Sequence, residues 1–150
     1  MEVTWFCPGG GEQDRFDNCL TFTNLHGDAK EHEKQLTFLK EVSSIIVILM
    51  STSDDNKGNR KIVSDMCQSS KPLILLLDDK GKVTVNNSGP RVRIGIRNRN
   101  EAELIGELTT TIGHLLKLSN TALSLENCAQ VVHKQGILID EDLRYFHFSQ

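Results

Sequence analysis

Residues 20–50 read LTFTNLHGDAKEHEKQLTFLKEVSSIIVILM, and this stretch decides the fold. Residues 20–24 have the pattern of a half-buried strand. Residues 29–42 then keep an approximate apolar stripe at helical spacing, with most charged side chains off it. Residues 45–50 are apolar without a break and rich in β-branched types, which is typical of a parallel strand covered on both faces. The stretch therefore predicts a strand, a turn, a helix and a second strand of an α/β domain.

The turn between the first strand and the helix is polar and is where chemistry would be expected. It runs from Asn24 to Asp28, and Gly27 within it is free to adopt a positive φ. Asp28 stands where a helix N-cap belongs, and Glu31 follows three residues later in capping-box spacing. A helix beginning at this point is the prediction, with Asp28 as its cap.

Length and charge limit the classes of protein that the chain can belong to. A length of 150 residues favours one domain, and a net charge of −3 with a pI of about 5.9 implies no general affinity for nucleic acid or anionic membranes. No apolar run approaches the roughly 20 residues that span a bilayer. The N-terminus has neither a basic lead nor a long apolar core, so no secretory signal is expected.

The four cysteines have no metal-binding or redox spacing. Cys7, Cys19, Cys67 and Cys128 are scattered, with no CxxC pair among them. Because disulfide frameworks belong to small secreted chains, we expect free thiols in a cytoplasmic or nuclear protein.

The rest of the chain continues the alternation of strands and helices. Strands are expected at residues 3–7, 73–77 and 91–97, and helices around 62–67, 100–116 and 123–135. Asn100 is the expected cap of the second of these helices, whose stripe is Leu104, Ile105, Leu108, Ile112, Leu115 and Leu116. Alternating strands and helices predict a layered α/β fold with a mainly parallel sheet, in which the first two strands form an antiparallel pair.

Several longer blocks of sequence carry a family resemblance. These are Trp5 to Gly10, Phe16 to Cys19, Phe22 to Ala29 and Ile94 to Asn100. They closely resemble the very large interferon-inducible GTPases and their relatives of the up-regulator of cell proliferation type. The resemblance covers residues 3–142 and implies a partial, degenerate G-like domain over residues 1–142, followed by a divergent tail at 143–150. It also implies GTP with Mg²⁺ as ligand, induction by interferon, and other G domains or protein partners as contacts.

The same resemblance implies three loops that would surround a nucleotide. Asn24, Gly27 and Asp28 would occupy the switch-type turn. Asp78, Asp79 and Lys80 would follow the strand whose end carries the guanine-reading motif. Residues 97–99 would lie near the base.

This sequence departs from the G-domain pattern at the points where chemistry occurs. No GxxxxGK[ST] is present in residues 1–150, and Pro8 to Gly11 run into acidic residues instead of a lysine. Asn24 replaces the usual aspartate, and Asp28 as a cap would occupy the helix end that otherwise attracts phosphate. Residues 78–82 can also be interpreted as the loop of a β-hairpin between strands 73–77 and 83–85.

Two functions therefore stay open, and no catalytic residue is assigned. One is a GTP-binding module without turnover, and the other is an inactive scaffold or regulatory domain that contacts proteins. A fold that lacks the first strand and the P-loop of a G domain is also expected to have a break at the centre of its sheet, with backbone groups left without partners.

Metal and nucleic-acid sites are considered and not favoured. His26, Asp28, His32 and Glu33 would be more often solvated than metal-binding. Arg91, Arg93, Arg97 and Arg99 are best interpreted as a solvated face, because no aromatic residue is interleaved with them.

Overall fold

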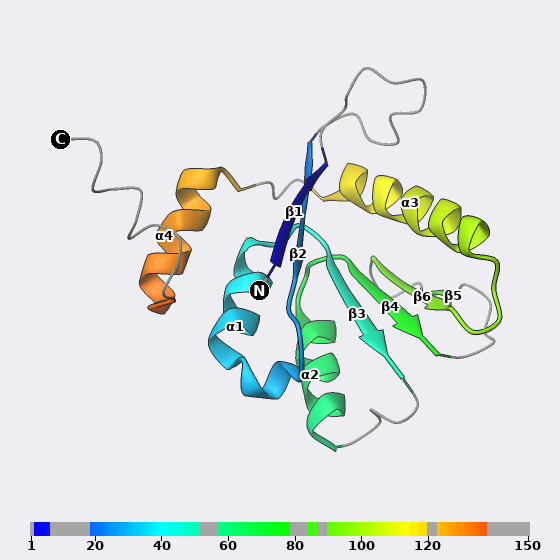
Figure 1. The fold of residues 1–150 in the computed structure, drawn as a ribbon, viewed down its shortest axis with the longest axis horizontal. Coiled ribbons are helices and arrows are strands. Elements are labelled where there is room, and N and C mark those ends of the chain that lie inside the picture. Colours follow the sequence, from blue (N-terminus) through cyan, green and yellow to red (C-terminus); the bar gives the residue numbers. More distant parts are fainter. Residues whose placement is uncertain are drawn as a thin grey trace.

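The computed structural model describes residues 2–6, 19–51, 57–78, 84–86, 90–119 and 123–137 (Figure 1). The strands are β1 (Glu2–Phe6), β2 (Leu20–Asn24), β3 (Ile46–Met50), β4 (Leu73–Leu77), β5 (Thr84–Asn86) and β6 (Arg91–Gly95). The helices are the 3-10 turn η1 (Ala29–Glu31), α1 (Glu33–Val42), α2 (Lys57–Gln68), α3 (Glu101–Leu118) and α4 (Leu125–Gln135). The tail at 143–150 lies outside the described residues.

The main sheet has the strand order β3-β4-β6-β5. β3, β4 and β6 are parallel, and the first residue of β4, Leu73, is in register with Ile46 and with Arg91. Leu73 and Ile74 point to opposite faces of the sheet and both are 0% exposed, so β4 is covered on both sides. This confirms the α/β fold with a mainly parallel sheet.

The expected hairpin between β4 and the following strand is wrong. β5 pairs antiparallel with β6 instead, with Val85 opposite Val92. β4 already has β3 on one edge and β6 on the other, so its backbone groups have no edge left for β5. Residues 79–83, which would have formed the hairpin loop, lie outside the described residues.

A second, separate sheet holds only β1 and β2 (Figure 1). The two strands are antiparallel, with Glu2 opposite Asn24 and Phe6 opposite Leu20, as the sequence predicted. Within the described residues, β2 pairs only with β1 and β3 pairs only with β4. The expected break in the sheet therefore lies between β2 and β3.

The core joins one face of the main sheet to α3. Its buried side chains are Ile74, Val92 and Ile94 from the strands and Ile112 and Leu115 from the helix. Leu20, Ile45, Leu76, Leu104, Leu108 and Leu116 pack against this cluster. Ile105, expected in the apolar stripe, is 43% exposed and is not among the residues that pack against this cluster.

The ends of the helices follow the capping rules with one exception. Asn100 Oδ1 accepts hydrogen bonds from the backbone N–H groups of Ala102 and Glu103, and Gly136 ends α4 with φ +63°. The exception is the predicted helix at Asp28. Asp28 caps only η1, and α1 starts after His32, whose φ of −125° and ψ of 47° interrupt the helix.

The start of β4 is tied to the end of α1 by a lysine. Lys71 Nζ donates hydrogen bonds to the carbonyl oxygens of Lys40 and Glu41, at 2.6 Å each. These carbonyls belong to the last turn of α1, which has no helical N–H to pair them. Burial lowers the pKa of Lys71, and the nearby Glu41 carboxylate opposes that shift.

The cysteines differ in part from the expectation of free thiols. Cys67 and Cys128 are free, whereas Cys19 is disulfide-bonded. The cysteine spacing carried no signal for this bond. Over the ranges that the structure describes, no helix combines the length and apolar character needed to cross a bilayer.

Candidate functional site

Asp78 lies at the carboxyl edge of the main sheet, where three parallel strands end. Its backbone N–H donates to the carbonyl of Met50 at 3.1 Å, and Ile96 N–H donates to Leu77 at 2.9 Å, so the chain leaves β3, β4 and β6 at one place. Ligands of open α/β sheets bind at this edge. Asp78 therefore follows β4 directly, at this edge of the sheet.

The carboxylate of Asp78 is held by an arginine from the end of β6. Arg97 Nε and Nη2 donate to Asp78 Oδ1 and Oδ2, at 3.0 Å each. The hydrogen bond from Arg97 lowers the pKa of Asp78, and its charge acts in the same direction. Both carboxylate oxygens thus accept from a guanidinium in this two-bond fork.

The sequence placed Arg97 in a base-side loop but missed this pairing. A signal was present, because both residues directly follow apolar runs expected to be parallel strands. The carboxyl ends of neighbouring parallel strands meet at one edge, so their next polar residues come together.

The switch-type turn has its own internal contacts. Asn24 ends β2, and Gly27 has φ +86°, which confirms the glycine conformation expected there. Asp28 Oδ1 accepts from the backbone N–H of Lys30 at 3.0 Å, and Lys30 Nζ lies 3.6 Å from Asp28 Oδ2. Asp28 is therefore a cap, as its spacing predicted.

The same turn lies against the start of α2. A Cβ built on Gly58 would stand 2.8 Å from Cε and 3.3 Å from Nζ of Lys30. The lysine side chain therefore passes directly over the first turn of α2. The contacts of the turn are thus with α2, whereas those of Asp78 are with Arg97, so these two groups of implied site residues contact different parts of the domain. Asp79 and Lys80, the other two residues of the implied guanine motif, lie outside the described residues.

Bound GTP with Mg²⁺ would meet residues that already have partners within this domain. A carboxylate reads guanine by accepting N–H groups, and each oxygen of Asp78 already accepts one hydrogen bond from Arg97, whose charge also offsets that of the carboxylate. Asp28 sets a negative charge and a cap at the turn that a phosphate would approach. Within the described part of the chain, no group of three His, Cys, Asp or Glu residues could hold a metal ion.

Two of the four arginines of the proposed solvated face form ion pairs. Arg97 is paired with Asp78, and Arg99 is paired with Glu103, at 3.1 Å, and with Glu107. Arg99 also donates to the carbonyl of Gly95 at 3.3 Å. Arg99 fastens the start of α3 to the end of β6, and Arg97 joins the ends of β4 and β6, so both have a structural role.

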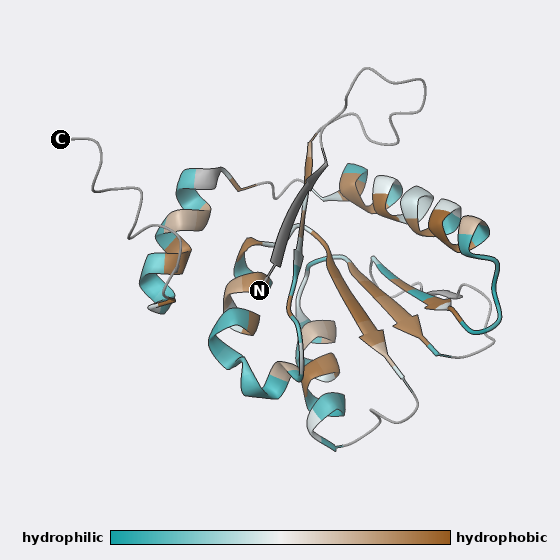
Figure 2. Ribbon diagram, viewed as in Figure 1, coloured by the Kyte–Doolittle hydropathy of each residue, from teal (hydrophilic) through white to brown (hydrophobic). Residues whose placement is uncertain are grey.

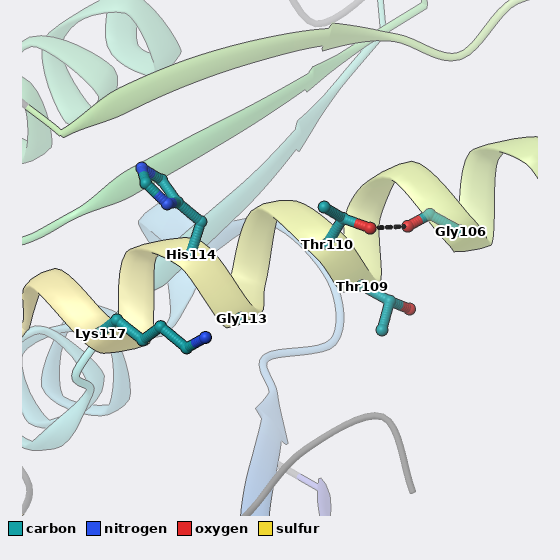
Figure 3. A pocket seen from close by; sticks show the side chains of 6 residues that line it. All are labelled: Gly106, Thr109, Thr110, Gly113, His114 and Lys117. Carbon is teal, nitrogen blue, oxygen red and sulfur yellow. Dashed lines mark hydrogen bonds between the residues drawn. The ribbon is translucent and has the colours of Figure 1, made fainter. Parts of the chain in front are cut away.

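An open depression of about 640 Å³ lies along α3 (Figure 3). Its lining residues are Gly106, Thr109, Thr110, Gly113, His114 and Lys117. Thr110 Oγ1 donates to the carbonyl of Gly106 at 2.9 Å, within the helix, and His114 and Lys117 point to different sides of it. The sequence did not single out this surface, whose signal is two glycines seven positions apart on one helix.

Comparison with known proteins gives the family of the chain. A sequence model of the up-regulator of cell proliferation-like domain matches residues 1–147. The chain is 71% identical to human interferon-induced very large GTPase 1 over 144 residues and 62% identical to its mouse counterpart, with 96% of this chain matched in each. It is 26% identical to human up-regulator of cell proliferation over 156 residues, which covers 95% of this chain and 16% of that protein.

The matched stretch spans about 6% of the length of the two interferon-induced relatives. No solved structure matches the chain. The match over residues 1–147 includes all the sequence blocks that carry the resemblance. It also includes every strand and helix of the described structure. The chain belongs to the family of up-regulator of cell proliferation-like domains and is a relative of the very large inducible GTPases.

Proposed function

We propose that this chain is a GTPase-like domain that does not hydrolyse GTP and acts through contacts with other proteins. The observation that carries the proposal is the Arg97–Asp78 fork, in which the carboxylate at the carboxyl edge of the sheet is bound by the protein's own arginine. An acidic group held in this way stabilises the sheet edge and is not presented to a base.

Three further features support the same conclusion. The sequence of residues 1–150 contains no GxxxxGK[ST], so the backbone cradle, the phosphate-binding lysine and the Mg²⁺-binding hydroxyl of a P-loop have no source in it. Asp28 is occupied as the cap of η1. The turn residue Asn24 carries no charge that could attract a hydrated Mg²⁺ ion.

A second candidate is binding of GTP with Mg²⁺ without turnover. The names of the relatives describe GTPases, and the chain shares 71% identity with one of them. Within this chain the supporting observation is the turn itself. Gly27 at φ +86° lets the backbone approach a ligand, and Lys30 lies over the N-terminal turn of α2, where N–H groups attract anions.

The proposed role also suggests what kind of partner the domain contacts and in which cellular compartment. We infer that the contacts are made with other G domains or with protein partners, in the cytoplasm or the nucleus, and without a nucleic acid or a membrane. Support comes from the net charge of −3 and from the intramolecular ion pairs of Arg97 and Arg99.

Titration of the folded chain with a fluorescent GTP analogue and Mg²⁺ tests the proposal, together with a single-turnover assay for released phosphate. The expected result is no saturable binding and no hydrolysis above buffer. Arg97→Gln, which releases Asp78, serves as the matched variant and is also expected not to bind. Saturable binding that prefers GTP over ATP would establish the second candidate, and phosphate release would overturn both.

A further inference from the structure

β3 has the sequence of a central strand and the position of an edge strand. Its residues, Ile46 to Met50, are all apolar, and Figure 2 draws the strand in hydrophobic colours. Natural sheets protect their edge strands with charges, prolines or bulges. The sequence of β3 contains no charged residue and no proline, and β3 stands at the end of the order β3-β4-β6-β5.

Two side chains of β3 are exposed on the face that α3 covers elsewhere. Val47 is in register with Ile74, and Leu49 with Leu76, so all four lie on the same face of the sheet. Ile74 is 0% exposed, whereas Val47 is 44% and Leu49 is 68% exposed. α3 therefore covers this face of the sheet over β4 but leaves these two side chains of β3 exposed.

The glycines of α3 lie on the side of the helix that faces away from the core. A Cβ built on Gly106 or on Gly113 would meet no atom within 4 Å, and both glycines line the depression in Figure 3. The apolar surface that a further strand could contact beside β4 is therefore that of Val47 and Leu49.

The β1–β2 ribbon marks the other side of the gap. Leu20 at the start of β2 and Ile45 just before β3 both pack against the core cluster, so the two strands begin near each other. They belong to separate sheets nevertheless.

We propose that a β-strand from polypeptide outside residues 1–150 adds to the edge of β3 that no described strand occupies. It would supply backbone N–H and C=O groups to β3 and apolar side chains against Val47 and Leu49, as strand addition does in peptide-binding domains. In the interferon-induced relatives the matched stretch is only about 6% of the protein, so polypeptide that could supply the strand is present there. The inference rests on the proposed role in protein contacts and names the contact surface.

The test uses the chain of 150 residues and a soluble probe peptide. The probe is lysine-flanked and fluorescein-labelled, with a central stretch of alternating valine and threonine as long as β3, which has 5 residues. A second peptide with a central proline, which lacks the backbone donor, is the control ligand. Binding is measured by fluorescence anisotropy, and the site by amide hydrogen exchange with and without probe. No nucleotide is present, so failure here leaves the nucleotide titration unaffected.

The expected result is saturable binding of the probe, at least about tenfold weaker for the proline peptide, with new protection concentrated in β3. Leu49→Lys is expected to abolish binding, because it replaces the apolar side chain against which the added strand would pack with a charged one. Leu118→Lys is the matched control, since Leu118 is 63% exposed and belongs to α3, not to the strand that pairs with the probe. Exposed positions tolerate both changes, and circular dichroism confirms that each variant is folded.

Three results would overturn the proposal. The first is the absence of both binding and new protection in a folded chain. The second is binding that persists unchanged in Leu49→Lys, which places the probe elsewhere. The third is a dimer in sedimentation equilibrium that is lost in Leu49→Lys, because the occupant of the edge would then be a second copy of the chain.

Discussion

Arg97 donates two hydrogen bonds of 3.0 Å to Asp78, and this pair joins the ends of two adjacent parallel strands. Asp78 follows β4 and Arg97 follows β6, which are neighbours in the sheet. The guanidinium fork matches both carboxylate oxygens at once, an arrangement that a lysine cannot reproduce. The position that the family resemblance implied for guanine recognition therefore makes a structural contact in this domain.

The first prediction concerns the pKa of Asp78. Arg97→Gln removes the hydrogen bonds and the charge that lower it, so the pKa should rise toward its ordinary value of 3.8. Carboxyl NMR titration measures the change, with Arg93→Gln, an exposed position on β6, as the control. An unchanged pKa of Asp78 in Arg97→Gln would contradict the assignment of the fork.

The same shift fixes the direction of a pH effect. The folded-state pKa of Asp78 is lower than its unfolded value, so its stabilising contribution is fully present above the unfolded pKa and is lost as pH falls through the folded pKa. Urea denaturation of the native chain and of Asp78→Asn should therefore give stabilities that differ at pH 7 and converge toward pH 3. Curves that diverge on acidification would show the opposite sign.

The second prediction concerns Lys71 and the end of α1. Lys71→Met keeps the aliphatic stem but loses both 2.6 Å hydrogen bonds to Lys40 and Glu41. The free energy of unfolding should fall by about 1–2 kcal/mol, because charged donors make the stronger hydrogen bonds. Urea denaturation measures this loss, and Lys34→Met on the exposed side of α1 should leave stability nearly unchanged. Equal losses in both variants would show that the contact contributes nothing specific.

The third prediction concerns the packing of α3 on the sheet. Leu115 is 2% exposed in the core cluster, so Leu115→Ala should lower the free energy of unfolding by about 2–5 kcal/mol through lost burial and a cavity. Leu118→Ala on the same helix, at 63% exposure, should change it by less than about 0.5 kcal/mol. Thermal or urea denaturation distinguishes them, and a small effect at Leu115 would mean that α3 does not pack as described.

The fourth prediction concerns the N-cap of α3. Asn100→Ala removes the acceptor for the N–H groups of Ala102 and Glu103 and should cost about 1 kcal/mol of stability. Asn100→Asp keeps an acceptor oxygen at the positive end of the helix and should preserve stability. The comparison is made by urea denaturation, and a destabilised Asn100→Asp would argue that the amide group, and not the oxygen, is what matters.

Much of the fold could be predicted because local signals and tertiary structure agree. The apolar runs around Ile48 and Leu75 became parallel strands, and Asn100 and Gly136 cap the helices that their positions indicated. The expectation that residues 45–50 are covered on both faces is wrong, because Val47 and Leu49 are exposed on one face of β3. β5 was assigned to the wrong partner because pairing depends on which edge is free, and β4 has none. The helix predicted from Asp28 is interrupted between η1 and α1 by the backbone angles of His32, which the sequence rules do not predict.

The site was predictable in its location and not in its contacts. Asp78 and the turn at Gly27 were found from their places after strands. The partner of Asp78 lies 19 residues away on another strand, so it becomes visible only when strand order is known. Likewise, the exposure of Leu49 follows from where α3 stops covering the sheet, which no local pattern reports.

Chemical-shift mapping with GTP and Mg²⁺ tests the central claim most directly, because it reports on each implied residue of the folded chain. The account predicts no saturable shift of the backbone amides of Asn24, Gly27, Asp28 and Asp78 as GTP with Mg²⁺ is added to the native protein. Saturable shifts at these four residues, absent when ATP is used, would contradict it and establish a working guanine-nucleotide site in this domain.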